Sequence, residues 1–536
     1  MIVPKPHNEK ILTYALQSDE RKKLLYELHM ISNDFIDIPA FIGSEEIRAG
    51  KTGLINEPHD HQHQLGQYHQ VSEKEIKQAI ESASRAWQDW SSYPYQHRAA
   101  IFLKGAELLS VKYRHLFNAV VMLSLSKNAY QAEIDTAELI DFWRFNPYFV
   151  EQLWRKHTLI SPQGEWNYLD PRPLEGFVFA ITPFNFASIA GNLPTAPAMA
   201  GNSVVWKPAS NAIYPAYLIM RILKEAGLPD GVINMIPGSG SEIGDIVINS
   251  TDLAGVHFTG STGVFNHIWK TIGNNIDKYR SYPRIVGETG GKDFIFAHRS
   301  ANIDNLVTAA VRGAFEYQGQ KCSAASRMYI PESIWSEFKQ KLISTLKTIK
   351  MGSPADLQNF YNAVIDKKSY DKIVSYIDKI KKSNGVEIIA GGSYEDSRGY
   401  FIEPTVIRTD NPTYLTMREE IFGPVLTIYI YPDEKYRETL QLCDNTSEYG
   451  LTGSIFSQNQ KSIIEADQIL RQSAGNFYIN DKPTGAVVGQ QPFGGSRKSG
   501  TNDKAGSITN LMRWISMRSV KVNFLPPDDY HYPFME

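Results

Sequence analysis

Hydrophobic and polar residues follow two different periods along this chain. From about Ser72 to Val150 the apolar residues recur every three or four positions, which predicts helices. The run SEKEIKQAIESASRAWQDW opens with Ser72 and Glu75 at capping-box spacing. From Gly176 onward, helical segments such as AIYPAYLIMRILKEAG separate the short β-rich runs GFVFAIT, NSVVWKP, GVINMIPG, GVHFTG and DFIFAH. Apolar strands separated by helices predict a parallel sheet that is covered on both faces.

The same alternation resumes after Cys322, with the strand-like runs SRMYIP, VEIIAGG, VLTIYIY and GSIFS. We therefore expect two α/β units in series. A segment near Thr158 to Leu174 and roughly the last forty residues fit neither unit, and they predict an arm. The terminal run LPPDDYHYPFME is expected to dock on something or to stay loose.

Composition narrows the class of protein. The 536 residues are 42% hydrophobic and 21% charged, which excludes disorder as the main state. The net charge is −3 and no basic stripe occurs, so nucleic-acid binding is not expected. Two cysteines exclude a cystine scaffold and a four-thiolate zinc site. Because MIVPKPHNEK has no apolar signal core, we predict a cytoplasmic protein.

One stretch could be mistaken for a membrane helix. Residues 176–206 contain no Asp, Glu, Lys or Arg, but Pro183, Pro194 and Pro197 interrupt them. A bilayer span needs a sustained apolar run, so we expect a buried strand, a turn and a packed helix instead.

The run YQGQKCSAASR contains a candidate nucleophile, Cys322. A thiolate needs a nearby donor or cation to lower its pKa, and a lone cysteine is more often a small buried hydrophobe. Thirty-four residues earlier, Glu288 of IVGETGGKD could activate water, although Glu before two glycines is also a common turn. Cys443, in QLCDNT, is expected to be structural.

Three further segments offer binding groups. The Asn185 amide of ITPFNF could donate to an oxyanion, and Lys207 of VVWKPAS could meet ribose hydroxyls or phosphate. The turn in HFTGSTGVF could present N–H groups to a pyrophosphate at a helix start. Each of these segments alone is more often an ordinary strand end or turn. His59, His61 and His63 suggest a metal site, but a solvated loop is the expected reading, and no metal is predicted.

Seven motifs occur in the order found in aldehyde dehydrogenases: TPFNF, WKP, FTGST, ETGGK, GQKC, EEIFGPV and PFGGSRKSG. The chain resembles this family over nearly its whole length. Four longer runs narrow the resemblance: QAEIDTAELIDFWRFN, LEGFVFAITPFNFASIAGNLPTAPAMAGN, EYQGQKCSAASR and VVGQQPFGGSRKSGTNDKAG. They are similar to the branch that oxidises L-glutamate γ-semialdehyde to glutamate with NAD in proline breakdown.

The resemblance implies a role for each matching position. Cys322 would be the nucleophile, Glu288 the base, and Asn185 part of the oxyanion hole. The implied NAD-binding residues are Thr182, Lys207, Gly260, Ser261, Thr262, Gly263, Val264, Glu420 and Phe422. The implied substrate-binding residues are Glu138, Phe186, Ser323, Gly485, Ala486 and Phe493. In this division Glu138 would pair with the substrate ammonium, while neutral donors would bind its carboxylate.

The implied fold is the α/β aldehyde dehydrogenase fold, with a Rossmann-like NAD-binding domain (1–156 and 183–286), a catalytic domain (287–498) and a β-flap (157–182 and 499–536). The flap would complete a partner subunit's sheet, so a homodimer or higher homo-oligomer is implied. A separate proline dehydrogenase is a further candidate partner; no membrane partner is expected.

Two readings compete with this one. The first is an aldehyde dehydrogenase for another acidic semialdehyde such as succinic semialdehyde. The second is a non-catalytic structural relative. One departure from the family pattern stands out, because the glycine-rich GQGKT stretch expected before QAEID reads LSLSKNAY here.

Overall fold

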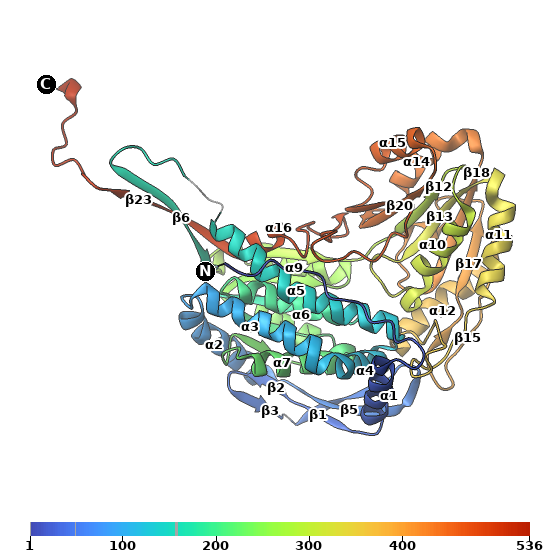
Figure 1. Cartoon of the computed structure of the whole chain (residues 1–536), viewed down its shortest axis with the longest axis horizontal. Coiled ribbons are helices and arrows are strands. Elements are labelled where there is room, and N and C mark those ends of the chain that lie inside the picture. The colour runs from blue at the N-terminus through green and yellow to red at the C-terminus, as the bar shows by residue number, and fades with distance from the viewer. Residues whose placement is uncertain (1, 49, 156–158, 536) are drawn as a thin grey trace.

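Two seven-stranded sheets, each packed between helices, form the body of the computed structural model, and a two-stranded arm projects from it (Figure 1). The structure describes residues 2–48, 50–155 and 159–535. The C-terminal end of the chain lies at the tip of the arm, far from both sheets (Figure 1). Two α/β units in series, as the alternation of strands and helices predicted, are confirmed.

The first sheet has a core of five parallel strands whose order is that of a Rossmann half-sheet. Across the sheet the strands are β11 (Arg284–Glu288), β10 (Leu253–Thr259), β7 (Phe177–Ile181), β8 (Ser203–Lys207), β9 (Ile233–Met235), β2 (Ala40–Ile42) and β3 (Glu45–Ile47). In chain order β7 to β11 read 3-2-1-4-5, so the order reverses beside β7. A ligand-binding crevice is expected at the carboxyl ends of the strands at that switch point.

Successive residues of β7 show why both faces of this sheet are covered. Val178 and Ala180 pack into one apolar cluster, whereas Phe177 and Phe179 pack into another on the opposite face. The first cluster includes side chains of α3 (Tyr95–Glu107), α4 (Arg114–Leu125), α5 (Ala129–Arg155), α6 (Ala187–Met199) and α7 (Ile213–Ala226). The second includes side chains of α2 (Glu73–Trp90), α8 (Gly240–Ile248) and α9 (Thr262–Asn274). The capping box of Ser72 and Glu75 is present at the start of α2.

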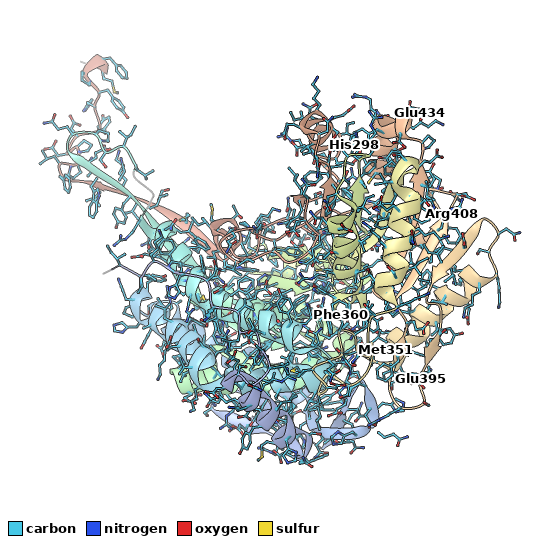
Figure 2. The ribbon with its side chains drawn as sticks, turned by 45° about the vertical axis from the view of Figure 1, so that its right-hand side comes forward. His298, Met351, Phe360, Glu395, Arg408 and Glu434 are labelled. Atoms are coloured by element: carbon cyan, nitrogen blue, oxygen red, sulfur yellow. The ribbon has the colours of Figure 1, made fainter. Side chains whose placement is uncertain are left out.

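The second sheet is parallel except for one edge strand. Its order is β14 (Val386–Ala390), β17 (Thr405–Thr409), β18 (Val425–Tyr431), β13 (Ala325–Pro331), β12 (Asp293–Ala297), β20 (Thr452–Phe456) and β21 (Asn476–Ile479). Its helices are α10 (Ile303–Phe315), α11 (Glu332–Leu346), α12 (Lys367–Lys381), α13 (Leu415–Arg418), α14 (Tyr436–Thr446) and α15 (Gln460–Ile469). This unit comes forward in Figure 2, where His298 and Arg408 are labelled on it.

Smaller elements join these units. A three-stranded sheet consists of β1 (Ile36–Ile38), β5 (Asp60–Gln70) and β4 (Lys51–Glu57), beside α1 (Asp19–Ser32). Two short ladders pair β15 (Tyr394–Glu395) with β16 (Phe401–Ile402), and β19 (Tyr449–Gly450) with β22 (Ser496–Arg497). The N-terminal segment runs along α5, where carboxylates accept from its backbone: Glu151 from Val3 N–H and Asp141 from Glu9 N–H.

The arm pairs β6 (Glu165–Pro173) with β23 (Ile515–Asn523) in an antiparallel ladder. The predicted arm segment 157–182 is therefore too long, because Phe177–Ile181 lies in the first sheet. Residues 157 and 158 of that prediction lie outside the described residues. The predicted C-terminal segment 499–536 also begins inside the body, since Leu511 of α16 (Ile508–Met512) and Trp514 are buried in the first cluster. Among the described residues, no helix is long and apolar enough to cross a bilayer.

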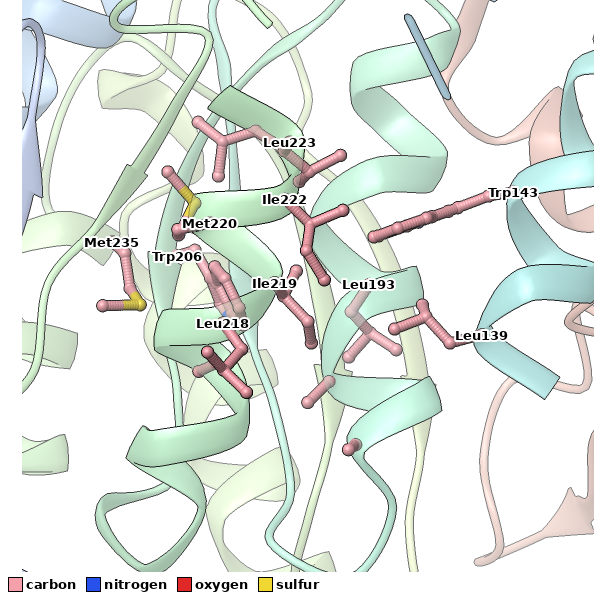
Figure 3. Close-up of a cluster of buried hydrophobic side chains, with 14 of the residues drawn as sticks. Leu139, Trp143, Leu193, Trp206, Leu218, Ile219, Met220, Ile222, Leu223 and Met235 are labelled. Carbon is pink, nitrogen blue, oxygen red and sulfur yellow. The ribbon is translucent and has the colours of Figure 1, made fainter. Parts of the chain in front are cut away.

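The first cluster gives a direct test of the core. Trp143 of α5 lies among Leu139, Leu193 and Ile219 (Figure 3), is fully buried, and donates from Nε1 to Thr195 Oγ1 at 3.1 Å. We expect Trp143→Ala to lower the free energy of unfolding by about 3–5 kcal/mol, because it leaves a large cavity. The thermal midpoint measured by calorimetry checks this. Tyr282→Ala, at an 80% exposed position, is the control and should leave the midpoint unchanged. Equal midpoints for the two variants would contradict the packing described.

Candidate active site

Four predicted site segments meet at the carboxyl edge of the first sheet. Thr182 follows β7, Lys207 ends β8, Gly260 follows β10 and Glu288 ends β11. Because these strands are parallel, their ends lie on the same side of the sheet, around the point where the strand order reverses. The structure therefore brings together groups that the sequence separates by about a hundred residues.

The start of α9 presents free N–H groups at this edge. Ser261 caps the helix, and its Oγ accepts from Val264 N–H at 3.4 Å. Val264 is 48% exposed, and Gly263 has nothing near the place of a Cβ, so a ligand can approach the first turn closely. A helix start with exposed N–H groups is suited to a phosphate.

Lys207 adds a cation beside the same edge. A Cβ on Gly240 would lie 3.8 Å from Lys207 Nζ, so the ammonium faces the start of α8. Burial lowers the pKa of this ammonium, and no other group contributes to the shift. Thr182 has a structural contact here, since its Oγ1 accepts from Trp206 Nε1 at 3.0 Å.

Cys322 lies in a turn between α10 and β13, and the chain enters this turn through residues with positive φ angles. Tyr317 and Gln318 have φ of 52° and 55°, and Gly319 has φ of 66°, three successive left-handed residues. A Cβ on Gly319 would lie 2.4 Å from the carbonyl oxygen of Gly423, so glycine is required by space as well as by φ. The strained turn delivers Cys322 to the cavity wall.

The surroundings of Cys322 raise the pKa of its thiol. Burial raises the pKa of the thiol, and the carboxyl groups of Asp293, Glu288 and Glu420 raise it further. A backbone hydrogen bond from Ser323 lowers the pKa in the opposite direction. The predicted role of Cys322 as a nucleophile therefore requires a change in this environment that stabilises the thiolate.

Asn185 connects the first sheet to the nucleophile turn. Its Nδ2 donates to the carbonyl oxygen of Gln320 at 3.1 Å, and the side chain is buried. An amide nitrogen carries two N–H donors, so one remains for an oxyanion formed at Cys322. Asn185, which the sequence predicts for the oxyanion hole, is thus bonded to a residue only two positions before Cys322.

Glu288 is held by the glycines of the PFGGSRKSG motif. Its Oε2 accepts from Gly495 N–H at 3.2 Å, and a Cβ on Gly494 would lie 3.0 Å from Oε1. Burial holds the pKa of Glu288 well above its usual range, while the Lys504 ammonium lowers the pKa and Asp503 raises it. A carboxylate with a raised pKa is suited to accepting a proton near neutral pH.

A cavity links Cys322 to the EEIFGPV motif. It is lined by Gly291, Gly319, Lys321, Cys322, Ala324, Ser326, Glu420, Ile421, Phe422, Gly423 and Val425. Glu420 Oε1 accepts from Gly291 N–H at 3.0 Å, and burial raises the pKa of this carboxyl. Phe422 has φ of 61° and packs edge-on against Phe184, with ring centres 5.9 Å apart.

The predicted substrate-binding residues form two groups. In one, the hydroxyls of Ser323 and Thr484 hydrogen bond at 2.7 Å beside exposed Gly485, whose φ is 100°. Ala486 follows it, half-buried.

In the other group, Ser188 Oγ donates to Glu138 Oε2 at 2.6 Å, and Phe186 lies two residues before Ser188. Burial raises the pKa of Glu138 to about 7. Phe493 belongs to neither group; it bridges to Ala505 by backbone hydrogen bonds and precedes Gly494, which contacts Glu288.

Several residues of this region were missed by sequence reasoning. They are the buried charges Lys127, Asp135, Lys292 and Asp293, together with half-buried Lys504. Burial raises the pKa of Asp293 to about 8. Among charged groups, its carboxyl has the largest effect on the pKa of the Cys322 thiol. Lys127, Lys292 and Lys504 lie outside helices and strands, so hydrophobic periodicity gave no signal for them.

The histidine cluster is not the solvated loop that the sequence predicted. His59 is buried and its Nε2 lies 2.9 Å from Glu57 Oε2, while His63 Nδ1 lies 3.1 Å from Glu57 Oε1. His61 Nε2 is 2.9 Å from the Asp396 carbonyl oxygen. Within the described ranges, no group of three or more His, Cys, Asp or Glu is arranged to hold a metal ion. Cys443 is fully buried in an apolar cluster, which confirms its structural reading.

Residues 48–520 match the aldehyde dehydrogenase family, and the chain belongs to this family. A curated relative, "Delta-1-pyrroline-5-carboxylate dehydrogenase, mitochondrial" of Dictyostelium discoideum, is 50% identical over 536 residues, which is 99% of this chain and 96% of the relative. The crystal structure of the Delta-pyrroline-5-carboxylate dehydrogenase from Mycobacterium tuberculosis bound with NAD is 48% identical, with a TM-score of 0.96. That match covers 100% of this chain and 99% of the other.

A third match is longer than this chain. Proline utilization A (PutA) from Bdellovibrio bacteriovorus is 30% identical with a TM-score of 0.93, and the match covers 97% of this chain but 54% of that one. The fold and the family that the seven motifs predicted are confirmed by these comparisons.

The two cysteines should differ sharply toward an alkylating reagent. Cys322 borders the cavity, whereas Cys443 is fully buried, so we expect iodoacetamide to modify Cys322 alone in the native protein. Because the pKa of the Cys322 thiol is raised, its alkylation rate should still be rising at pH 9. Peptide mass spectrometry over a pH series measures both. Modification of Cys443 in the native protein, or a rate that levels off below pH 8, would contradict the site described.

Proposed function

We propose that this chain is an NAD-dependent L-glutamate γ-semialdehyde dehydrogenase, acting on the open form of pyrroline-5-carboxylate. The observation that carries the proposal is the convergence of Cys322, Asn185 and Glu420 at the carboxyl edge of a Rossmann-order sheet. Relatives that match over their whole length carry the corresponding names. A nucleophile, an oxyanion donor and a cofactor-facing carboxylate are the parts that oxidation through a thioester needs.

The residues at the edge of the first sheet suit NAD. The start of α9, with Ser261 and Gly263, would hold the pyrophosphate, and Lys207 would meet the adenosine ribose. Glu420 is oriented by Gly291 N–H, which leaves its second oxygen to accept from the hydroxyls of the nicotinamide ribose. When bound, NAD supplies the acceptor for the hydride that leaves the aldehyde carbon.

The chain's own residues carry the remaining steps. The Cys322 thiolate bonds to the aldehyde carbon, and the carbonyl electron pair moves to oxygen, where Asn185 and the Cys322 N–H donate hydrogen bonds. Loss of hydride leaves a thioester on sulfur. Glu288 then takes a proton from water, the water oxygen bonds to the acyl carbon, and the carbon–sulfur bond breaks. Glutamate leaves and the thiolate is restored.

Glu138 favours an amino-acid aldehyde over other acidic semialdehydes. Its carboxyl is half-buried, and in the described structure its hydrogen-bond donor is Ser188. A substrate ammonium would supply the charge partner that a buried carboxylate needs, whereas succinic semialdehyde has none. Ser323, Gly485 and Ala486 would bind the α-carboxylate, and Phe186 and Phe493 would enclose the aliphatic chain.

The arm supports a proposal about assembly, and the relatives' names bear on the compartment. The β6–β23 arm carries exposed Trp166 and Phe524, and we propose that it completes a sheet of a second copy in a homodimer or larger homo-oligomer. The division into NAD-binding, catalytic and flap domains belongs to the same proposal. A separate proline dehydrogenase as the supplier of substrate belongs to the proposal as well, and the match to a protein named for proline utilization fits a role in proline metabolism. The Dictyostelium relative is named mitochondrial, so the cytoplasmic prediction needs cell fractionation.

Substrate choice tests the proposal. The wild-type protein should form NADH rapidly from NAD and pyrroline-5-carboxylate, and Cys322→Ala should form none. Glu138→Gln should lower kcat/KM for this substrate about 10- to 100-fold, the scale of one lost charged hydrogen bond, and should barely affect succinic semialdehyde. Initial rates at 340 nm give both ratios. Equal losses for the two aldehydes would sink the assignment, and no turnover by the wild type would favour a non-catalytic relative.

The base can be tested separately from the nucleophile. In Glu288→Gln the water is no longer deprotonated, so we expect steady-state turnover to fall about 10²- to 10⁴-fold. The first turnover should persist, giving a burst of NADH near one per site in stopped flow. If the burst disappears together with turnover, Glu288 is needed before hydrolysis and the role given to it is wrong.

A further inference from the structure

The departure LSLSKNAY forms a turn that is tied to both α/β units. Ser126 has φ of 54°, and its carbonyl oxygen accepts from Gln318 Nε2 at 3.0 Å beside the nucleophile turn. Asn128 Nδ2 donates to the carbonyl oxygen of Phe360 at 2.9 Å; Phe360 is labelled in Figure 2. Because both neighbours of Lys127 are anchored in this way, its side chain is directed into the protein.

The Lys127 ammonium lies in a wholly buried site with one charge partner. It is 2.7 Å from Asp135 Oδ2, and it sits over the rings of Phe186 and Tyr317, 4.2 Å and 4.6 Å from their centres. A buried lysine needs such compensation, because leaving water costs a charge several kcal/mol. The mechanism described above uses neither Lys127 nor Asp135.

Asp135 also caps the start of α6. Its Oδ2 accepts from Ala187 N–H at 3.0 Å and its Oδ1 accepts from Ser188 N–H at 2.8 Å. A carboxylate at a helix start satisfies free N–H groups and complements the helix dipole. The start of α6 fixes the positions of Asn185 and Phe186, which lie just before the helix, and of Ser188, which donates to Glu138.

The same charges surround Glu138. Asp135 and Asp141, on its own helix, raise the pKa of Glu138, whereas Lys127 and the hydrogen bond from Ser188 lower it. Lys127 in turn faces Lys321 of the nucleophile turn. Glu138 must be ionised to pair with an ammonium, so the cation at position 127 helps to keep it competent near neutral pH.

We propose that Lys127 is a positioning residue of the substrate pocket. Its ammonium fixes Asp135 against the start of α6 and holds the Phe186 ring, so the end of the pocket that receives the amino-acid group is built before substrate arrives. The proposal rests on the proposed function for the identity of the substrate.

The test compares Lys127→Met with the double variant Lys127→Met/Asp135→Asn, which removes both charges and folds without an unpaired buried carboxylate. Kinetics with pyrroline-5-carboxylate, succinic semialdehyde and NAD are measured from pH 6 to 9. In Lys127→Met we expect KM for pyrroline-5-carboxylate to rise about 10-fold at pH 7, with the KM for NAD unchanged. The acid limb of kcat/KM should move to higher pH, because a neighbour that lowers the pKa of Glu138 is gone. The double variant should move the limb back toward the wild type, since a neighbour that raises this pKa is also gone.

An unchanged acid limb and KM in Lys127→Met, with an active wild type, would overturn the proposal. Equal losses with both aldehydes and NAD would also overturn it, because they indicate a structural role only. A crystal structure of either variant tests the positioning role without an activity measurement. A turned Phe186 ring and a displaced first turn of α6 support the proposal, whereas unchanged positions contradict it. An inactive wild type, by contrast, refutes the proposed function.

Discussion

The site depends on a close approach of backbone at Gly290 and Gly291, where the chain passes from the first sheet to the second. A Cβ on Gly290 would lie 2.2 Å from Glu420 Oε2, and a Cβ on Gly291 would lie 2.3 Å from the Cys322 carbonyl oxygen. A side chain at either glycine would push the Cys322 turn away from the Glu420 carboxylate. The crossing also carries Glu288 on one side and the N–H that orients Glu420 on the other.

Burial gives the site its chemistry. The carboxyl groups of Glu288, Asp293 and Glu420 all lie in surroundings that raise their pKa values, and together with burial they raise the pKa of the Cys322 thiol. These surroundings therefore disfavour the charged forms of Cys322 and Glu288, the proposed nucleophile and base. Water exclusion makes each remaining donor, such as the Asn185 amide, more effective.

Strand runs and motif order were enough to predict much of this arrangement. Alternating clusters on β7, the capping box at Ser72 and the placement of Glu288 at a strand end all follow from local pattern. The pattern of residues placed the arm near Thr158 to Leu174 and the run from Gly176 in the sheet, as observed, whereas the flap bounds 157–182 taken from the family resemblance included strand β7 wrongly. The burial of His59 is a tertiary effect, because Gly399 packs against its backbone. Lys127 and Asp135 were missed for the same reason. Their ion pair joins a turn to helix α5, and Asp135 in turn caps a third element, helix α6.

The central claim is that the substrate carbon is joined to Cys322 during oxidation. The most direct measurement is acid quenching of the wild-type enzyme during turnover of isotope-labelled pyrroline-5-carboxylate, followed by peptide mass spectrometry. Acid keeps the substrate amine protonated, so the γ-thioester cannot cyclise away from sulfur. The account predicts label on the peptide that contains Cys322 and none on the peptide that contains Cys443. Rapid NADH formation with no label on Cys322, under conditions where a thioester survives, would contradict it.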